Sequence, residues 1–181
     1  SIKGYVIESY GYEPWAQILT GAEVDQGVFI EMRNHSDEDT VRLLEATAEV
    51  TGVPLERHLS LLGSYWVRRV ATTRFSGLID KYGSTLPALV SNLDAMHSEI
   101  SNVFLNYQPP SFEIVQTSTF GFQITYRSQR RGLTSFVIGI IEELGVFYGQ
   151  AVVISNVSQK PEMKGQESVI DLEMRPSSVE A

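Results

Sequence analysis

The chain has no cysteine, and this absence excludes several kinds of site. Without cysteine there is no disulfide framework, no thiolate metal site and no thiol nucleophile. The histidines do not stand at the spacings expected of a zinc site. The sequence also lacks a nucleophile elbow, a phosphate-binding loop and any metal-ligand spacing. We therefore expect no enzymatic activity.

Positive charge and long apolar runs are scarce as well. Lys and Arg total 14 against 22 Asp and Glu, which gives a formal charge of -8. This balance works against nucleic acid or an anionic membrane as the main partner. The longest apolar runs are far below the ~18 residues of a membrane span, and no signal-peptide pattern stands at the start. We expect a soluble protein without membrane insertion, and we take the cytoplasm as its default location.

What is present predicts a single α+β domain over residues 1–181. With 181 residues, 43% of them hydrophobic, the chain can bury a substantial core, and no change in composition suggests a second domain. The apolar spacing predicts a helical N-terminal half packed on a small antiparallel sheet with one inserted helix. The expected helices are 36–51, 55–62, 63–73, 77–82, 84–105 and 133–148. The expected strands are 112–117, 120–130, 150–157 and 167–174. We expect a polar loop at 158–166 and a disordered tail at 175–181.

One histidine lies on an apolar helix face. His97 stands between Leu93 and Ile100 on the apolar stripe of the last helix of the first half. A lone histidine on such a face is usually a core residue satisfied by one backbone carbonyl. The alternative is an axial ligand of haem iron through a neutral imidazole. His35, beside a helix cap, and His58, in the first turn of a helix, are expected at the surface.

A second pattern lies at the end of a predicted strand. Tyr126, Ser128 and Arg130 stand at alternate positions. On a strand they share one face with three apolar residues, Phe120, Phe122 and Ile124. A phenol, a hydroxyl and a guanidinium at the end of a buried row are costly unless paired, so they suggest an anionic, mostly apolar ligand. The other reading is an exposed strand end with Arg130 solvated. Together with His97, the three groups fit haem.

Four segments carry a resemblance to a known family, namely Asn92–His97, Pro109–Phe112, Tyr126–Arg130 and Val137–Ile141. The Tyr-x-Ser-x-Arg triplet alone is short, but a histidine upstream and a Pro-Pro pair between them make the combination specific. From about Val6 to Met174 the chain resembles the H-NOX domain (haem nitric oxide/oxygen binding). That domain is the sensor of animal soluble guanylate cyclase β subunits and of stand-alone bacterial proteins.

The resemblance implies a bound haem b and assigns its contacts. His97 would be the proximal iron ligand, and Pro110 would press on the haem plane. Arg130 would form a charge-assisted pair with a haem propionate, with neutral donors from Tyr126 and Ser128 beside it. The remaining assigned contacts are apolar residues of the pocket, Leu93, Leu133 and Phe136.

Gas selectivity in this family is set three residues before Gly139, where oxygen-holding members have a tyrosine. This chain has Phe136, which offers no hydrogen-bond donor. Bound O2 carries partial negative charge and needs such a donor, whereas NO binds strongly without one. The resemblance therefore implies binding of NO and CO rather than stable binding of O2. Tyr65 and Trp66 could also face the distal side.

Two features of the chain depart from the family pattern. Relatives usually have a longer first helix before a motif like Tyr10–Trp15, so we expect a shortened helix and a more open distal side. Relatives often carry cysteines near the helix after the triplet, and their absence here excludes a zinc or thiol switch at that position.

The resemblance implies a sensor in which NO, unlike CO, releases the proximal histidine. The expected effector is a histidine kinase, a diguanylate cyclase or a guanylate cyclase. A gas-binding or haem-storage protein without a signalling partner would use the same pocket, so this alternative stays open. A haem-free dimerisation module is a third reading, and His97 and the triplet argue against it.

Overall fold

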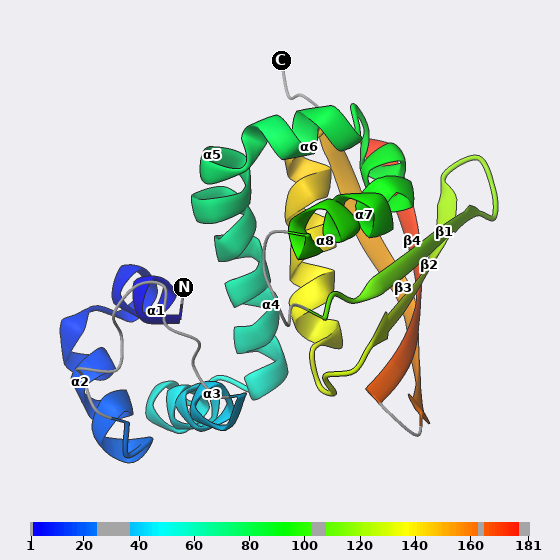
Figure 1. The fold of residues 1–181 in the computed structure, drawn as a ribbon. Coiled ribbons are helices and arrows are strands. Elements are labelled where there is room, and N and C mark those ends of the chain that lie inside the picture. Colours follow the sequence, from blue (N-terminus) through cyan, green and yellow to red (C-terminus); the bar gives the residue numbers. More distant parts are fainter. Residues whose placement is uncertain (1, 25–36, 103–107, 163–164, 178–181) are drawn as a thin grey trace.

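The computed structural model describes residues 2–24, 37–102, 108–162 and 165–177. It confirms the α+β fold: helices precede a four-stranded antiparallel sheet, and one long helix is inserted within it (Figure 1). The helical elements are α1 (Ile2–Tyr10), α2 (Tyr12–Gly21), α3 (Asp37–Thr51), α4 (Leu55–Trp66), the π-helical turn η2 (Val67–Ala71), α5 (Thr72–Arg74), α6 (Ser76–Tyr82), α7 (Leu86–Ser101) and α8 (Thr134–Phe147).

Helix α4 passes α8 at close range, and two glycines permit this contact. A Cβ atom on Gly63 would lie 2.2 Å from the Phe136 carbonyl oxygen, and one on Gly139 would lie 1.9 Å from the Ser60 carbonyl oxygen. The predicted helix boundary at Gly63 was wrong, because α4 continues through η2 and α5 as far as Arg74. Glycine lowers helix propensity. It stands inside this helix because no larger side chain fits between the two backbones.

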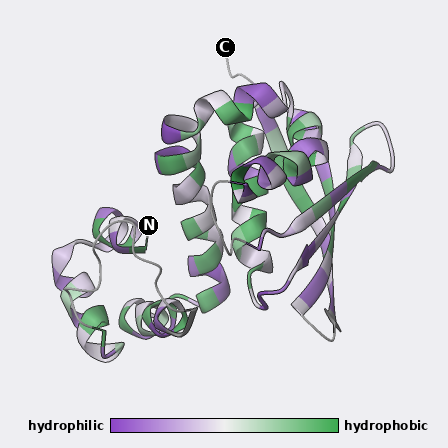
Figure 2. Ribbon diagram, viewed as in Figure 1, coloured by the Kyte–Doolittle hydropathy of each residue, from purple (hydrophilic) through white to green (hydrophobic). Residues whose placement is uncertain are grey.

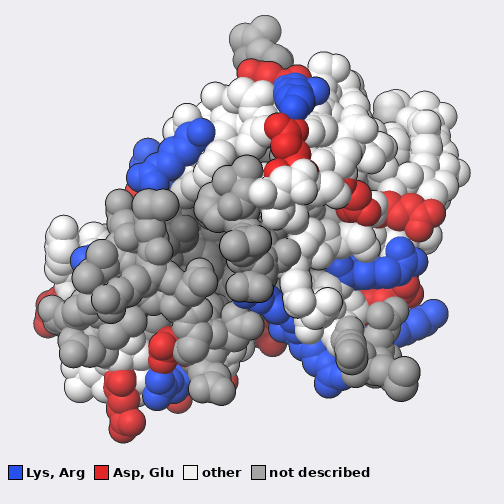
Figure 3. Space-filling view, in the orientation of Figure 1, with Lys and Arg blue, Asp and Glu red and all other residues white. Residues whose placement is uncertain are grey.

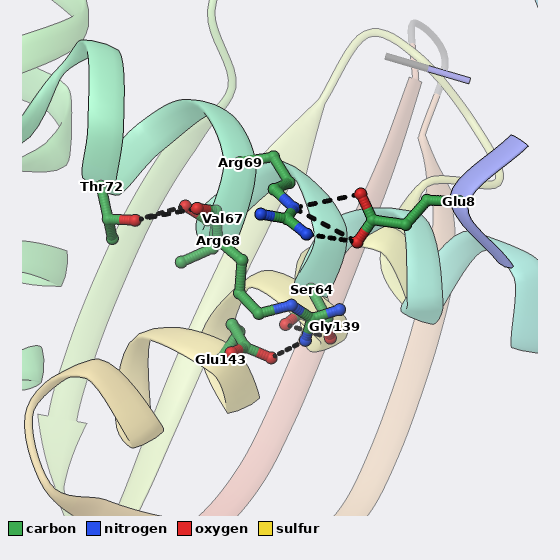
Figure 4. A network of polar contacts seen from close by, with 8 residues as sticks. All are labelled: Glu8, Ser64, Val67, Arg68, Arg69, Thr72, Gly139 and Glu143. Carbon is green, nitrogen blue, oxygen red and sulfur yellow. Dashed lines mark hydrogen bonds and ion pairs between the residues drawn. The ribbon is translucent and has the colours of Figure 1, made fainter. Parts of the chain in front are cut away.

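Ion pairs join the π-helical turn to the helices on either side of it (Figure 4). Arg68 pairs with Glu143 of α8 at 2.6 Å, and Arg69 pairs with Glu8 of α1 at 2.7 Å. Thr72 donates a hydrogen bond from Oγ1 to the first carbonyl of the turn at 2.9 Å. Exposed ion pairs contribute roughly 0.2–1 kcal/mol each. The close contact of α4 with α8 therefore does more to fix their relative position.

The sheet has the strand order β1-β2-β4-β3, with every neighbouring pair antiparallel. Its strands are β1 (Ser111–Gln116), β2 (Gly121–Ser128), β3 (Gln150–Glu162) and β4 (Gly165–Pro176). The predicted loop 158–166 was wrong, because β3 and β4 remain paired almost throughout it. Its side chains are polar because most of this part of β3 faces solvent, and backbone pairing does not require an apolar face. Arg175 and Pro176 likewise belong to β4 and not to a disordered tail.

The buried apolar side chains form two clusters on either side of the contact between α4 and α8. Figure 2 shows how apolar residues alternate with polar ones along the helices and strands. One fills the space between the sheet and helices α7 and α8, with Ile124, Ile170 and Leu172 at its centre. The other packs α1, α2 and α3 against α4, around Ile18 and Leu43. Within the described ranges, no helix is both long and apolar enough to cross a membrane.

Candidate functional site

Helix α7 carries His97, and its start is fixed by a local cap. Thr85 caps the helix through its side chain, which accepts a hydrogen bond from the Ala88 amide at 3.3 Å, and Pro87 lies in the first turn. Leu89 is buried on the face of α7 that packs on the main core. His97, two turns further along, is half-buried, as its place on the apolar stripe predicted. Residues 103–105 of the predicted helix lie outside the described residues.

The ring of His97 has a defined tautomer. Its Nδ1 lies 3.2 Å from the carbonyl oxygen of Pro110. A carbonyl can only accept, so Nδ1 carries the proton and Nε2 carries a lone pair. Burial lowers the pKa of His97, against the smaller opposing effects of the Pro110 bond and the charge of Asp94. The imidazole is therefore neutral near pH 7 and has the form that can bind a metal through Nε2.

A second hydrogen bond ties α7 to the start of β1. Asp94 Oδ1 accepts from the backbone amide of Phe112 at 2.9 Å. Asp94 and His97 are three positions apart, so they lie on neighbouring parts of one helix face. Together they hold the backbone on both sides of Ser111. The role of Asp94 was missed from the sequence, although it lies inside the segment Asn92–His97 that carried the resemblance.

A row of mutually tilted rings continues from His97 to the second strand. The ring centroids of His97 and Phe112 are 6.1 Å apart, and those of Phe112 and Tyr126 are 5.3 Å apart. Phe112 and Tyr126 are direct partners in the β1–β2 register. Tyr126 is 2% exposed, and this burial raises its pKa, opposed by a hydrogen bond with Ser128 and by the charge of Arg130. The phenol is therefore protonated at neutral pH.

The triplet is only partly arranged as the sequence predicted. Tyr126 and Ser128 share the inner face of β2, but the strand ends at Ser128, so Arg130 lies in the following turn. Ser128 Oγ accepts from the Arg130 amide at 3.1 Å, and this bond turns the chain away from the sheet. Arg130 is exposed, and Phe120 is 46% exposed and precedes the strand, so strand alternation was wrong for both. The backbone turn still keeps Arg130 beside Ser128.

The apolar residues predicted to line the pocket are divided between the two clusters. Leu93 packs against the cluster on the sheet, whereas Leu133 and Phe136 pack against the N-terminal cluster. Tyr65 belongs to the second cluster and Trp66 to the first, so only Tyr65 shares the surroundings of Phe136. The residues predicted to line one pocket therefore do not share one cluster.

One histidine was placed wrongly from the sequence. His58 was expected at the surface but is fully buried, with Nδ1 2.8 Å from the Tyr5 hydroxyl and Nε2 2.7 Å from Thr51 Oγ1. Its position three residues after Leu55 and four before Leu62 placed it on the apolar face of α4, which was the available signal. His35 lies outside the described residues. The described part of the chain holds no cluster of three or more His, Asp or Glu suited to a metal ion.

One surface hollow lies away from the predicted haem contacts. A hollow between α2 and α3 is lined by mixed charged and small residues, among them Glu23, Arg42 and Glu49. Its lining includes none of the predicted haem contacts. On the face drawn in Figure 3, basic and acidic side chains are interspersed. Among the ion pairs of the sheet, Arg127 Nε lies 2.7 Å from Glu167 Oε2.

Comparison with known proteins identifies the family of this chain and the solved structures that share its fold. The haem-NO-binding family model matches residues 1–156. Soluble guanylate cyclase gcy-31 of Caenorhabditis elegans is 27% identical over 153 residues, which make up 84% of this chain and 22% of that protein. Soluble guanylate cyclase gcy-35 of the same organism is 24% identical, over 88% of this chain and 24% of that protein. The chain thus spans less than a quarter of the length of these relatives.

Solved structures share the fold at low identity. Unliganded iron(II) H-NOX from K. algicida superposes with a TM-score of 0.81 at 17% identity, over 99% of this chain and 96% of that one. A point mutant of T. tengcongensis H-NOX superposes with a TM-score of 0.81 at 15% identity, over 98% of this chain and 95% of that one. An oxygen-binding H-NOX domain, solved as its oxygen complex, superposes with a TM-score of 0.77 at 14% identity, over 99% of this chain and 94% of that one. At these identities the likeness shows the fold alone.

Proposed function

Because the chain belongs to the haem-NO-binding (H-NOX) family, a family of haem-based gas-sensing domains, we propose that it holds haem b through His97 and senses nitric oxide. The observation that carries the proposal is the bond from His97 Nδ1 to the Pro110 carbonyl. That bond fixes the tautomer with its lone pair on Nε2, and burial keeps the ring neutral.

The other donors suit the propionate edge of a haem. Tyr126 and Ser128 supply hydroxyl groups on one face of β2, and Arg130 supplies a guanidinium beside them. These three groups can bind the carboxylates of haem. The apolar side chains of Leu93 and Leu133 can pack against the porphyrin ring. Haem, when bound, supplies the iron on which a diatomic gas binds. The chain would supply the iron-binding nitrogen of His97, the anion donors and the apolar side chains beside the porphyrin.

Phe136 supports binding of NO and CO over stable binding of O2. It packs against the N-terminal cluster and offers no donor on that side. The second candidate is oxygen binding, since Tyr65 packs against the same cluster and carries a hydroxyl. The family contains a structure described as an oxygen complex. A persistent oxygenated spectrum in air would favour this second candidate.

We infer that the domain passes its signal to an effector and has no reaction of its own. The soluble guanylate cyclase relatives are several times longer than this chain. A fused guanylate cyclase, a separate histidine kinase and a diguanylate cyclase are the effectors that the resemblance implies. A gas-binding or haem-storage protein would bind the same ligands but would show no change in structure with NO.

The deciding experiment is the absorption spectrum of His97→Gly with and without imidazole. Loss of the wild-type ferrous spectrum, and its recovery with added imidazole, are the expected results. His58→Gln is the matched control, because His58 is also buried but belongs to the N-terminal cluster. A His97→Gly protein that keeps the wild-type ferrous spectrum without imidazole would show that His97 is not the ligand.

A further inference from the structure

A buried polar network lies directly behind the turn that carries Arg130. Gln166 of β4 is 8% exposed, and its amide nitrogen contacts Thr134 Oγ1 at 3.0 Å and Ser168 Oγ at 3.1 Å. Thr134 Oγ1 and Ser168 Oγ are 2.8 Å apart, and these two residues are 2% and 0% exposed. The same amide nitrogen lies 2.8 Å from Gln159 Oε1 on β3. The network thus joins two strands to the first turn of α8.

The same glutamine also holds the turn itself. Its Oε1 accepts from the backbone amide of Gly132 at 3.0 Å. Arg131, the residue before Gly132, donates from Nε to the carbonyl of Gly165 at 3.1 Å. A Cβ on Gly165 would lie 2.0 Å from the Ser128 carbonyl oxygen, so β4 presses closely against the start of the turn. Residues of β4 therefore hold the turn at its start and at its end.

The register of the sheet places this network beside the predicted anion donors. Tyr126 pairs with Ser168, and Ser128 pairs with Gln166, across β2 and β4. Directly paired residues point to the same face of a sheet. The hydroxyl groups of Tyr126 and Ser128 therefore have the network as their immediate neighbours, and Arg130 follows in the turn that Gln166 fixes.

We propose that Gln166 is a positioning residue, which with Thr134 and Ser168 sets the place of Arg130 and so the affinity for the carboxylates of haem. The proposal rests on the function proposed above. A buried amide is costly unless its groups are paired, and here both its oxygen and its nitrogen are used. An apolar side chain of the same volume would fill this space without that cost. The observed network therefore selects one geometry of the turn, at the point where a charged donor has to meet its ligand.

The test compares Gln166→Met with a glutamine on the other face of the same two strands. Methionine keeps the volume and removes the hydrogen bonds. The control is Gln123→Met, because Gln123 of β2 is half-buried and donates to Asp171 Oδ1 of β4 at 2.8 Å. Haem transfer to apomyoglobin gives the rate of haem loss in the wild type, in each variant, in Arg130→Ala and in the Gln166→Met, Arg130→Ala double variant. Hydrogen exchange at the Gly132 amide of the haem-free proteins gives a readout that needs no haem.

Gln166→Met is expected to lose haem about tenfold faster, the equivalent of one hydrogen bond, and Gln123→Met at nearly the wild-type rate. In the Arg130→Ala background the same change should alter the rate less than about twofold, because the residue acts through Arg130. Exchange at Gly132 should rise in Gln166→Met alone. An unchanged rate, or an equal increase in both backgrounds, would overturn the proposal. A wild-type protein that takes up no haem would instead contradict the proposed function, and Gly132 exchange would still decide whether Gln166 holds the turn.

Discussion

His97 and Pro110 are joined by a hydrogen bond of 3.2 Å between the ring Nδ1 and the backbone carbonyl. Because Asp94 binds the Phe112 amide from the same helix face, two contacts couple α7 to the start of β1. Pro110 was predicted to press on the haem, and its carbonyl also orients the proposed iron ligand. A displacement of α7 would therefore move the first strand of the sheet together with the histidine.

The first prediction tests this coupling through Asp94→Ala. Removing the carboxylate leaves the Phe112 amide without its partner, so the free energy of unfolding should fall by about 1 kcal/mol, a modest value because the bond is exposed. Urea unfolding of the haem-free protein measures it. Asp80→Ala, an exposed aspartate on α6, is the control and should change stability by less than about 0.5 kcal/mol. Equal effects of the two substitutions would argue against a specific tie between α7 and β1.

The second prediction concerns the contact of α4 with α8. Gly139→Ala should destabilise the protein by about 1–3 kcal/mol, because the new methyl group would have to displace the Ser60 carbonyl. Gly77→Ala is the matched control. Its Cβ would meet nothing within 4 Å, and its helical backbone should gain stability by about 0.5–1 kcal/mol. Thermal unfolding of both variants should give shifts of opposite sign, and a neutral Gly139→Ala would mean that the helices can separate without cost.

The glycines and histidines show what the sequence could and could not predict. The helix stripe located His97 correctly, because its burial follows from its own helix. Gly63 was taken for a helix end, because its tertiary neighbour Phe136 lies far away in the chain and no local pattern reveals it. His58 lay on an apolar stripe too, but its place in the first turn suggested exposure. Its partners Tyr5 and Thr51 come from α1 and α3, and their approach is a property of the folded chain.

The strands likewise show which features local sequence patterns can and cannot predict. Alternation placed Tyr126 and Ser128 on one face, and the register confirms it. It could not show that β2 ends at Ser128. There the Arg130 amide, which would otherwise continue the strand pairing, donates its hydrogen bond to the Ser128 side chain. The polar end of β3 was taken for a loop because strand signals come from side chains, whereas its pairing with β4 comes from the backbone.

The third prediction is a pH dependence of stability. Burial lowers the pKa of His58 and of His97 below the usual value of about 6.5. The unfolded chain then takes up protons at a higher pH than the native protein, so the free energy of unfolding should fall as the pH drops below about 6.5. The fall should level off once the pH is below the native pKa values. Above about 7.5 neither group is charged in either state, and their contribution should be constant.

Urea unfolding of the haem-free protein at a series of pH values measures this dependence. His58→Gln removes one of the two titrating groups, so the difference between wild type and variant isolates the contribution of His58 from that of the carboxylates. A variant whose stability falls as steeply as that of the wild type between pH 7 and 5.5 would show that His58 is not held neutral by the fold.

The fourth prediction concerns the gas. Ferrous protein in air should form no lasting oxygen complex, whereas CO and NO should bind, because Phe136 cannot donate a hydrogen bond. Phe136→Tyr should shift the protein toward oxygen binding, and stopped-flow absorption would show a slower release of O2. Tyr65→Phe is the paired variant. If wild type holds oxygen and Tyr65→Phe does not, the donor is Tyr65 and the selectivity was assigned to the wrong residue.

The last prediction concerns the signal. A ligand biases two conformations only through its different affinity for them, and the bond between iron and His97 is the contact proposed to differ between NO and CO. If NO releases His97, α7 loses its tie to the haem, and movement of the helix strains the bonds by which Asp94 and His97 join it to residues 110–112. Exchange in the last turns of α7 and at the Phe112 amide should then rise with NO and stay unchanged with CO.

The Phe112 amide is the informative probe, because its partner Asp94 lies on the helix that would move. Hydrogen exchange of the NO and CO complexes, read together with their electronic spectra, gives the comparison. In Asp94→Ala the amide should exchange rapidly with either gas, which shows that the probe reports the coupling and not the gas itself. A six-coordinate NO complex at room temperature, with exchange equal to that of the CO complex, would mean that gas binding does not move α7. The haem-storage reading would then explain the protein better than the sensor.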